Sequence, residues 1–201
     1  MSSREKILAE IQKNKPEALP LPEKFSALQD DGNLVAKYQA VLQAIGGLPK
    51  RVEGLEGVAA VIERGVAEEV EVVNGIEGLP HYNIQAYAGK EATAIEAVHT
   101  VVLKGELAVA ENGSVWVPEA NMVNRLLPFL CQQLVLVVSE TSVVATMHEA
   151  YDRIKVDEDG FGVFIAGPSK TADIEQSLVI GAHGPLSLQV FLISSAAPTR
   201  L

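Results

Sequence analysis

The sequence predicts an α/β fold, with a three-layer, mostly parallel sheet flanked by helices, and three observations indicate it. Runs rich in Val and Leu, such as Leu134–Val138, are typical of strands buried on both faces of a parallel sheet. Segments with apolar residues at helical spacing alternate with these runs along the chain. The length of 201 residues suits one domain, so we expect a single core.

The N-terminal region is predicted to form an arm outside this core. Residues 4–13 carry apolar side chains at helical spacing, which predicts a short helix. Three prolines between residues 16 and 22 favour an extended, stiff segment up to Phe25. We expect residues 1–25 to lie along the domain or along a partner subunit, and residues 26–201 to form the α/β domain.

From residue 32 onward, the periodicity predicts helices and strands in alternation. The expected helices are 32–45, 55–64, 91–98, 143–154 and 172–179. The expected strands are 70–73, 100–103, 134–138, 162–165 and 187–193, with a hairpin at 107–117.

Charge and cysteine usage exclude several classes of function. The net charge of −10 and the pI near 4.9 argue against a nucleic-acid or anionic-membrane partner, which would favour a basic face. The N-terminus lacks the apolar core of a signal peptide, and Leu134–Val138 is too short to span a bilayer, so we expect a cytoplasmic protein. The single cysteine, Cys131, cannot hold an iron–sulfur cluster alone, and we expect it in the core.

The first loop that could carry chemistry is the predicted hairpin turn. Asn112-Gly113 lies between two apolar runs and favours a two-residue type I′ turn. One interpretation is a purely structural hairpin. The other is that the turn presents Glu111 at a site, with the backbone amides of Gly113 and Ser114 exposed to bind an anionic group.

The second loop follows the predicted strand at 162–165. A glycine turn at the carboxyl end of a strand, leading into a helix, is where α/β sheets usually bind anions. Two carboxylates in the first turn of the predicted helix would weaken phosphate binding, so a metal, an amine or a purely structural role based on helix capping is favoured over a phosphate cradle. The candidate residues are Gly167, Ser169, Lys170, Thr171 and Asp173.

The third loop is Gly181–Pro185, before the last predicted strand. His183 lies between small residues and Pro185, next to Gly184, which suits a cleft better than a core. The remaining histidines have no metal-ligand spacing, so we expect no metal site. Zincin, P-loop, Rossmann and serine-hydrolase motifs do not occur.

These motifs resemble a known family. Residues 166–185, Ala-Gly-Pro-Ser-Lys-Thr-Ala-Asp-Ile-Glu-Gln-Ser-Leu-Val-Ile-Gly-Ala-His-Gly-Pro, resemble the G-P-S-x-T-A-D-I-E…L-V-x-G-x-H-G-P hallmark of the lactate-utilisation protein C family, the LUD domain. The hairpin is similar to the family's A-E-T-G or A-E-N-G segment, with Asn112 where many members have Thr. The resemblance implies a fold like that of glucosamine-6-phosphate deaminase, ribose-5-phosphate isomerase and CoA transferases.

The resemblance also implies a function. It implies an accessory component of an iron–sulfur system that oxidises L-lactate to pyruvate, binding a small anionic ligand or a partner subunit. The iron–sulfur clusters would belong to the partner proteins, with no cofactor in this chain and no activity of the isolated chain. The oligomeric state stays open, with a homo-oligomer among the options.

Two alternatives remain. One is a stand-alone enzyme that acts on a sugar phosphate or an acyl-CoA through Glu111, Asp173 and His183, since the hairpin turn is similar to the Ser-Glu-Asn-Gly turn of class I CoA transferases. It requires these three residues to converge in one cleft. The other is a ligand sensor on the same fold.

Overall fold

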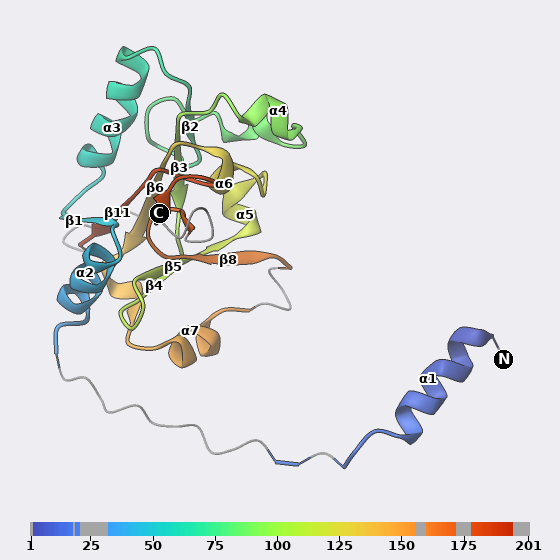
Figure 1. The fold of residues 1–201 in the computed structure, drawn as a ribbon. Helices are drawn as coiled ribbons and strands as arrows, with labels where there is room; N and C mark the ends of the chain where they lie inside the picture. The colour runs from blue at the N-terminus through green and yellow to red at the C-terminus, as the bar shows by residue number, and fades with distance from the viewer. Residues whose placement is uncertain (1, 18, 21–31, 156–159, 172–177, 195–201) are drawn as a thin grey trace.

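A parallel sheet of five strands forms the centre of the protein (Figure 1). The computed structural model describes residues 2–17, 19–20, 32–155, 160–171 and 178–194. The strand order is β1-β11-β6-β3-β2, and every neighbouring pair is parallel, which confirms the α/β class with a mostly parallel sheet. The strands are β1 (Leu48–Val52), β2 (Val72–Asn74), β3 (Thr100–Lys104), β6 (Gln133–Ser139) and β11 (Ser187–Ile193).

Helices flank the sheet on both faces, and successive side chains of β6 point alternately to one face and to the other. Val135 and Val137 pack in the core cluster that includes residues of α3. Leu136 packs in the cluster that includes Tyr38 and Leu42 of α2. Both faces of β6 are therefore buried, as its sequence predicts. The helices are α2 (Leu34–Ala44), α3 (Glu56–Ala67), α4 (Ala92–Ile95), α5 (Glu119–Met122), α6 (Leu127–Leu130) and the 3₁₀ helices η1 (Ile84–Tyr87) and η2 (Glu140–Ser142).

A smaller sheet packs below the face that α2 covers. Its order is β7-β4-β5-β8, and β4 and β5 form the predicted hairpin. Helix α7 covers the outer face of this sheet, where Trp116 packs near Ala150. From top to bottom, Figure 1 thus shows α3, the parallel sheet, the smaller sheet and α7. The elements are β4 (Leu107–Val109), β5 (Ser114–Pro118), β7 (Val143–Val144), α7 (Met147–Arg153) and β8 (Gly162–Ile165).

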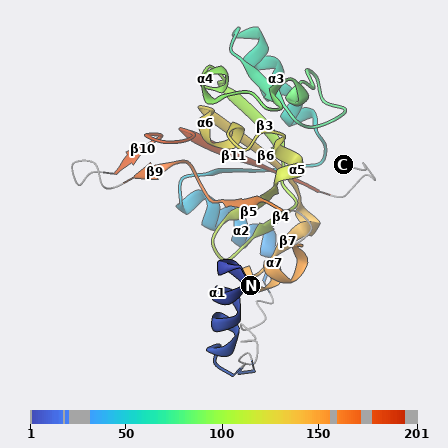
Figure 2. The same ribbon diagram turned by 90° about the vertical axis from the view of Figure 1, so that its right-hand side faces the viewer.

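The predicted N-terminal helix is confirmed as α1 (Ser3–Lys13) and lies apart from the sheets in both views (Figures 1 and 2). A capping box between Ser2 and Glu5 starts it. Helix α1 buries no residue, and Ile7, Leu8 and Ile11 are 60%, 48% and 59% exposed.

One predicted helix needs correction, and a second can be compared with the structure only at its end. The helix expected over 143–154 begins only at Met147, because Val143 and Val144 pair with β4 and Thr146 caps the helix. The helix expected over 172–179 falls largely outside the described residues. Its flanks are strands, since β9 (Lys170–Thr171) pairs antiparallel with β10 (Val179–Ile180), and this hairpin projects from the body in Figure 2. Thr171 is thus a strand residue.

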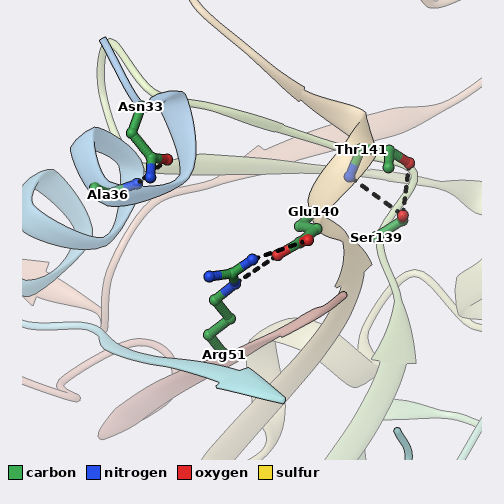
Figure 3. Close-up of polar contacts among 6 residues, drawn as sticks. All are labelled: Asn33, Ala36, Arg51, Ser139, Glu140 and Thr141. Atoms are coloured by element: carbon green, nitrogen blue, oxygen red, sulfur yellow. Dashed lines mark hydrogen bonds and ion pairs between the residues drawn. The ribbon is translucent and has the colours of Figure 1, made fainter. Parts of the chain in front are cut away.

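The edge strand β1, which the sequence did not predict, is anchored by a charged pair. The Arg51 guanidinium donates two hydrogen bonds to the Glu140 carboxylate, at 2.6 and 3.1 Å, across β11 (Figure 3). Glu140 follows Ser139, whose hydroxyl accepts a hydrogen bond from the Thr141 amide and so shapes the end of β6.

Tyr38 gives a prediction for alkaline stability. Its side chain is fully buried, its hydroxyl has no partner among the described residues, and burial raises its pKa. In the unfolded chain the Tyr38 hydroxyl ionises near pH 10, whereas the fold keeps it neutral at that pH. Above about pH 10 the unfolded state therefore binds fewer protons than the folded state, and the free energy of unfolding falls as the pH rises.

We expect Tyr38→Phe to raise the free energy of unfolding by about 1 kcal/mol at pH 7, because it removes a buried unpaired hydroxyl. The variant should also lose less stability between pH 9 and 11 than the parent chain, as urea unfolding can measure. Tyr151→Phe, which changes a 59% exposed ring, is the control. Lower stability of Tyr38→Phe at pH 7 would show that the hydroxyl has a partner.

Candidate functional site

A cavity of about 590 Å³ lies at the carboxyl ends of β2 and β3. Its walls come from the start of α3, the loop that follows β2, the residues around η1, the end of β3 and the α5 region. Ligands of α/β proteins bind at the carboxyl edge of the sheet, which makes this cavity the candidate site. It is lined by Leu55, Gly75, Ile76, Glu77, Gly78, Tyr82, Ile84, Gln85, Lys104, Ala120, Asn121 and Val123.

Asn74, the last residue of β2, fixes the loop that forms one wall. Its side chain is fully buried, and its amide donates to the carbonyl oxygens of Pro80 and Ile76 at 2.9 and 3.2 Å. Its oxygen accepts from the Ile76 amide at 2.8 Å. Asn83 closes the loop, because its side chain accepts from the Asn74 amide and donates to the Val72 carbonyl. The wall is thus built by side chains and is held rigidly against β2.

A strained backbone forms another part of the wall. Val123 has φ +59° and ψ −42°, and the Asn124 amide donates to the Met122 carbonyl at 2.6 Å, which closes a γ-turn around a β-branched residue. Asn124 holds the turn, since its amide donates to the carbonyl oxygens of Tyr87 and Lys90, both at 3.0 Å. Such strain concentrates at functional sites, where the surrounding structure maintains it.

The cavity brings together groups of opposite charge. Lys104 is half-buried at the end of β3, and its carbonyl accepts from the Asn121 amide at 3.0 Å, which anchors α5. Glu77 lies on the loop that Asn74 fixes. An ammonium and a carboxylate in one cavity can bind a small hydroxy acid, because the ammonium pairs with the acid and the carboxylate accepts from the hydroxyl. Sequence reasoning missed this site, although Asn74-Gly75 directly after a Val-rich strand was a signal for it.

The hairpin turn differs from its prediction. It spans four residues, 110–113, because Val109 pairs with Ser114. The Asn112 oxygen accepts from the backbone and the hydroxyl of Ser114 at 3.0 and 2.7 Å, and the Gly113 amide donates to the Val109 carbonyl at 2.9 Å. The two amides that were expected to bind an anion therefore donate to acceptors inside the turn.

The end of α2 brings the first two predicted loops together. A Cβ on Gly113 would lie 3.1 Å from Ile45 Cδ1, and a Cβ on Gly167 would lie 2.9 Å from the Ile45 carbonyl oxygen. The Lys170 ammonium donates to that same carbonyl. Both glycines have positive φ and no side chain, so they allow the two loops to pack closely on Ile45. The hydrogen bond from Lys170 adds to the same contact between the loop and Ile45.

The third loop joins the second. The Ser169 amide donates to the Pro185 carbonyl at 2.9 Å, and a Cβ on Gly184 would lie 2.9 Å from Ser169 Cβ. His183 is exposed and lines a separate cavity of about 430 Å³ beside α6.

Glu111 and His183 are not joined by any contact that the described residues show. The Glu111 carboxylate accepts from the Met147 amide at 2.8 Å, at the start of α7, whereas His183 faces α6. Asp173 lies outside the described residues. The convergence that the stand-alone enzyme requires therefore has no support from the described contact of Glu111.

Cys131 is a core residue, as predicted. It is 2% exposed, and burial raises the pKa of its thiol to about 12, so it is protonated at neutral pH. In the described ranges, no three His, Cys, Asp or Glu side chains gather as a metal site. Within the same ranges, no helix has the length and apolar character that crossing a membrane requires.

Comparison with known proteins finds a matching domain family and proteins of similar sequence. The profile of the LUD domain matches residues 91–193. Lactate utilization protein C of Bacillus subtilis (strain 168) is 31% identical over 125 residues, 59% of this chain and 52% of that protein. The protein of the same name from Geobacillus thermodenitrificans (strain NG80-2) is 34% identical over 107 residues, 50% and 45% of the two chains. The chain spans about half the length of these curated relatives.

A solved structure shares the fold. It is the crystal structure of a DUF162 family protein from Deinococcus radiodurans, with a TM-score of 0.58 and 16% identity over 80% of this chain and 96% of that chain. The cavity lies partly inside the matched range, through Lys104, Asn121 and Val123, and partly before it.

Proposed function

The chain belongs to the LUD domain family, and from this premise we propose that it is an accessory component of an iron–sulfur system that oxidises L-lactate to pyruvate. Its part is to bind the small anionic ligand in the Lys104 cavity. The observation that carries the proposal is that Lys104 and Glu77 both line one cavity at the carboxyl edge of the sheet.

The chemistry of this pair suits a 2-hydroxy acid. The Lys104 ammonium would bind the carboxylate of lactate, and the Glu77 carboxylate would accept its hydroxyl hydrogen. Pyruvate has no hydroxyl, so it would leave Glu77 without a donor and would bind more weakly. The relatives' names, which refer to lactate utilization, support the same ligand class.

The redox step belongs to the partner proteins in this proposal. Oxidation of lactate to pyruvate releases two electrons and two protons, and Cys131 alone cannot hold an iron–sulfur cluster. The cavity of about 590 Å³ exceeds what a three-carbon acid fills, so a group of the partner can reach the bound acid.

Helix α1 supports a role in a complex. An isolated helix of 11 residues is only marginally stable in water, and most helical stability in proteins comes from tertiary packing. The three exposed apolar side chains of α1 would gain that packing on a partner subunit.

A binding assay combined with reconstitution tests the proposal. We expect L-lactate to raise the melting temperature of the isolated chain more than pyruvate does, without turnover, since a ligand at a hundred times its Kd stabilises by about 2.7 kcal/mol. Lys104→Gln should remove this shift. Lactate oxidation should require the iron–sulfur partners and should fall with Lys104→Gln.

Lys13→Gln is the matched control, because it removes the same charge at the end of α1, outside the cavity. Lactate oxidation by the isolated chain would contradict the accessory role. A lactate shift that survives Lys104→Gln would contradict the site.

A further inference from the structure

A second cavity, of about 470 Å³, lies at the opposite edge of the same sheet. It opens between α3 and the amino ends of β3 and β6. Helix α3 covers the apolar middle of this face, where Val102, Val135 and Phe191 pack. The cavity therefore lies beyond these apolar side chains, towards the amino ends of the strands.

Strand register explains why its floor is polar. Thr100 pairs with Gln133 at the amino ends of β3 and β6, and two residues further along the strands Val102 pairs with Val135. Residues two apart on a strand share a face, so Thr100 and Gln133 lie on the α3 face. Gln189 pairs with Val135 and extends this polar floor onto β11.

Three basic side chains line this cavity, although the chain as a whole carries a net charge of −10. Lys50 comes from β1, Arg64 from α3 and His99 from the residue before β3. Glu68 is the one carboxylate among the described lining residues. Formal charge is therefore locally positive, against the sign of the protein, and such a site attracts anions.

Two contacts orient two of these basic side chains. Lys50 Nζ lies 5.5 Å from the centroid of the Phe191 ring, which places the lysine side chain over the α3 face. His99 Nδ1 lies 2.9 Å from the Thr100 hydroxyl, so its other ring nitrogen is the one available to a ligand. Strands β1 and β3 are three positions apart in the sheet, which separates their backbones by roughly 14 Å.

We propose that this cavity binds an elongated small polyanion, with separated negative groups that Lys50, Arg64 and His99 contact, as a second ligand site. The volume lies within the range of small-molecule sites. A single small anion would reach one cation, whereas an extended polyanion would bridge cations on different elements. The site is separate from the Lys104 cavity and does not depend on the lactate proposal.

Tripolyphosphate and orthophosphate, compared at equal ionic strength by calorimetric titration and thermal shift, test the proposal. We expect tripolyphosphate to bind and to raise the melting temperature, and orthophosphate to do neither. Lys50→Gln and Arg64→Gln should each raise the Kd for tripolyphosphate about tenfold, because each removes a charge-assisted contact.

Arg153→Gln is the matched control for Arg64→Gln, since both arginines lie in the last turn of a helix. It should leave the Kd unchanged. Equal shifts with the two anions would mean general screening of an acidic protein and would overturn the proposal. Failure of tripolyphosphate to bind, or binding that Lys50→Gln and Arg64→Gln do not weaken, would also overturn it.

Discussion

Gly162→Ala is expected to lower the free energy of unfolding by about 3 kcal/mol, at the upper end of the usual cost of overpacking. A Cβ at this position of β8 would lie 2.2 and 2.3 Å from the Cζ2 and Cη2 atoms of Trp116. Trp116 is 5% exposed, and its ring contacts that of Phe164 with centroids 4.8 Å apart. The indole has no room to move without disturbing the core between the smaller sheet and α7.

The effect is steric, and a second glycine separates it from backbone strain. Gly160 has φ +72°, and among the described residues no atom lies within 4 Å of the place that its Cβ would take. Gly160→Ala should therefore cost only about 1 kcal/mol, for the positive φ. Trp116 is the single tryptophan of the sequence, so denaturant unfolding followed by its fluorescence measures both variants. Equal costs for the two substitutions would show that the indole is not tightly packed on Gly162.

The parallel sheet was largely predictable, because the sequences of its central strands themselves indicate burial on both faces. Strand β6 is buried on both faces, and its unbroken apolar run shows this directly. Strand β1 gave no such signal, since it contains Pro49, Lys50 and Arg51. These residues are tolerated because β1, among the strands that the structure describes, pairs only with β11, and an edge strand accepts proline and charge.

The candidate site was not predictable from local motifs. Its lining comes from five separate stretches of sequence, and the pairing of β2 with β3 is what brings the loop after Asn74 to the end of β3. The glycine loops drew attention because their motifs are local. In the structure, polar atoms of Asn112, Lys170 and Ser169 instead contact neighbouring residues.

Asn74→Ala is expected to cost about 3 kcal/mol, because it leaves the Ile76 amide and the Pro80 carbonyl without their partner in a buried site. The loop that carries Glu77 would lose its anchor to β2. We therefore expect the variant to lose the lactate response of the Lys104 cavity at temperatures where it is still folded.

A second asparagine makes this prediction specific to burial. Asn112 forms the same local hydrogen bond as Asn74, from the backbone amide two residues further on, but Asn112 is exposed. Asn112→Ala should thus cost about 1 kcal/mol or less and keep the lactate response. Urea unfolding and a lactate titration of both variants measure the difference. If the two substitutions cost the same, local turn formation rather than buried hydrogen bonding holds the wall of the cavity. If Asn74→Ala keeps the lactate response, the loop does not shape the ligand site.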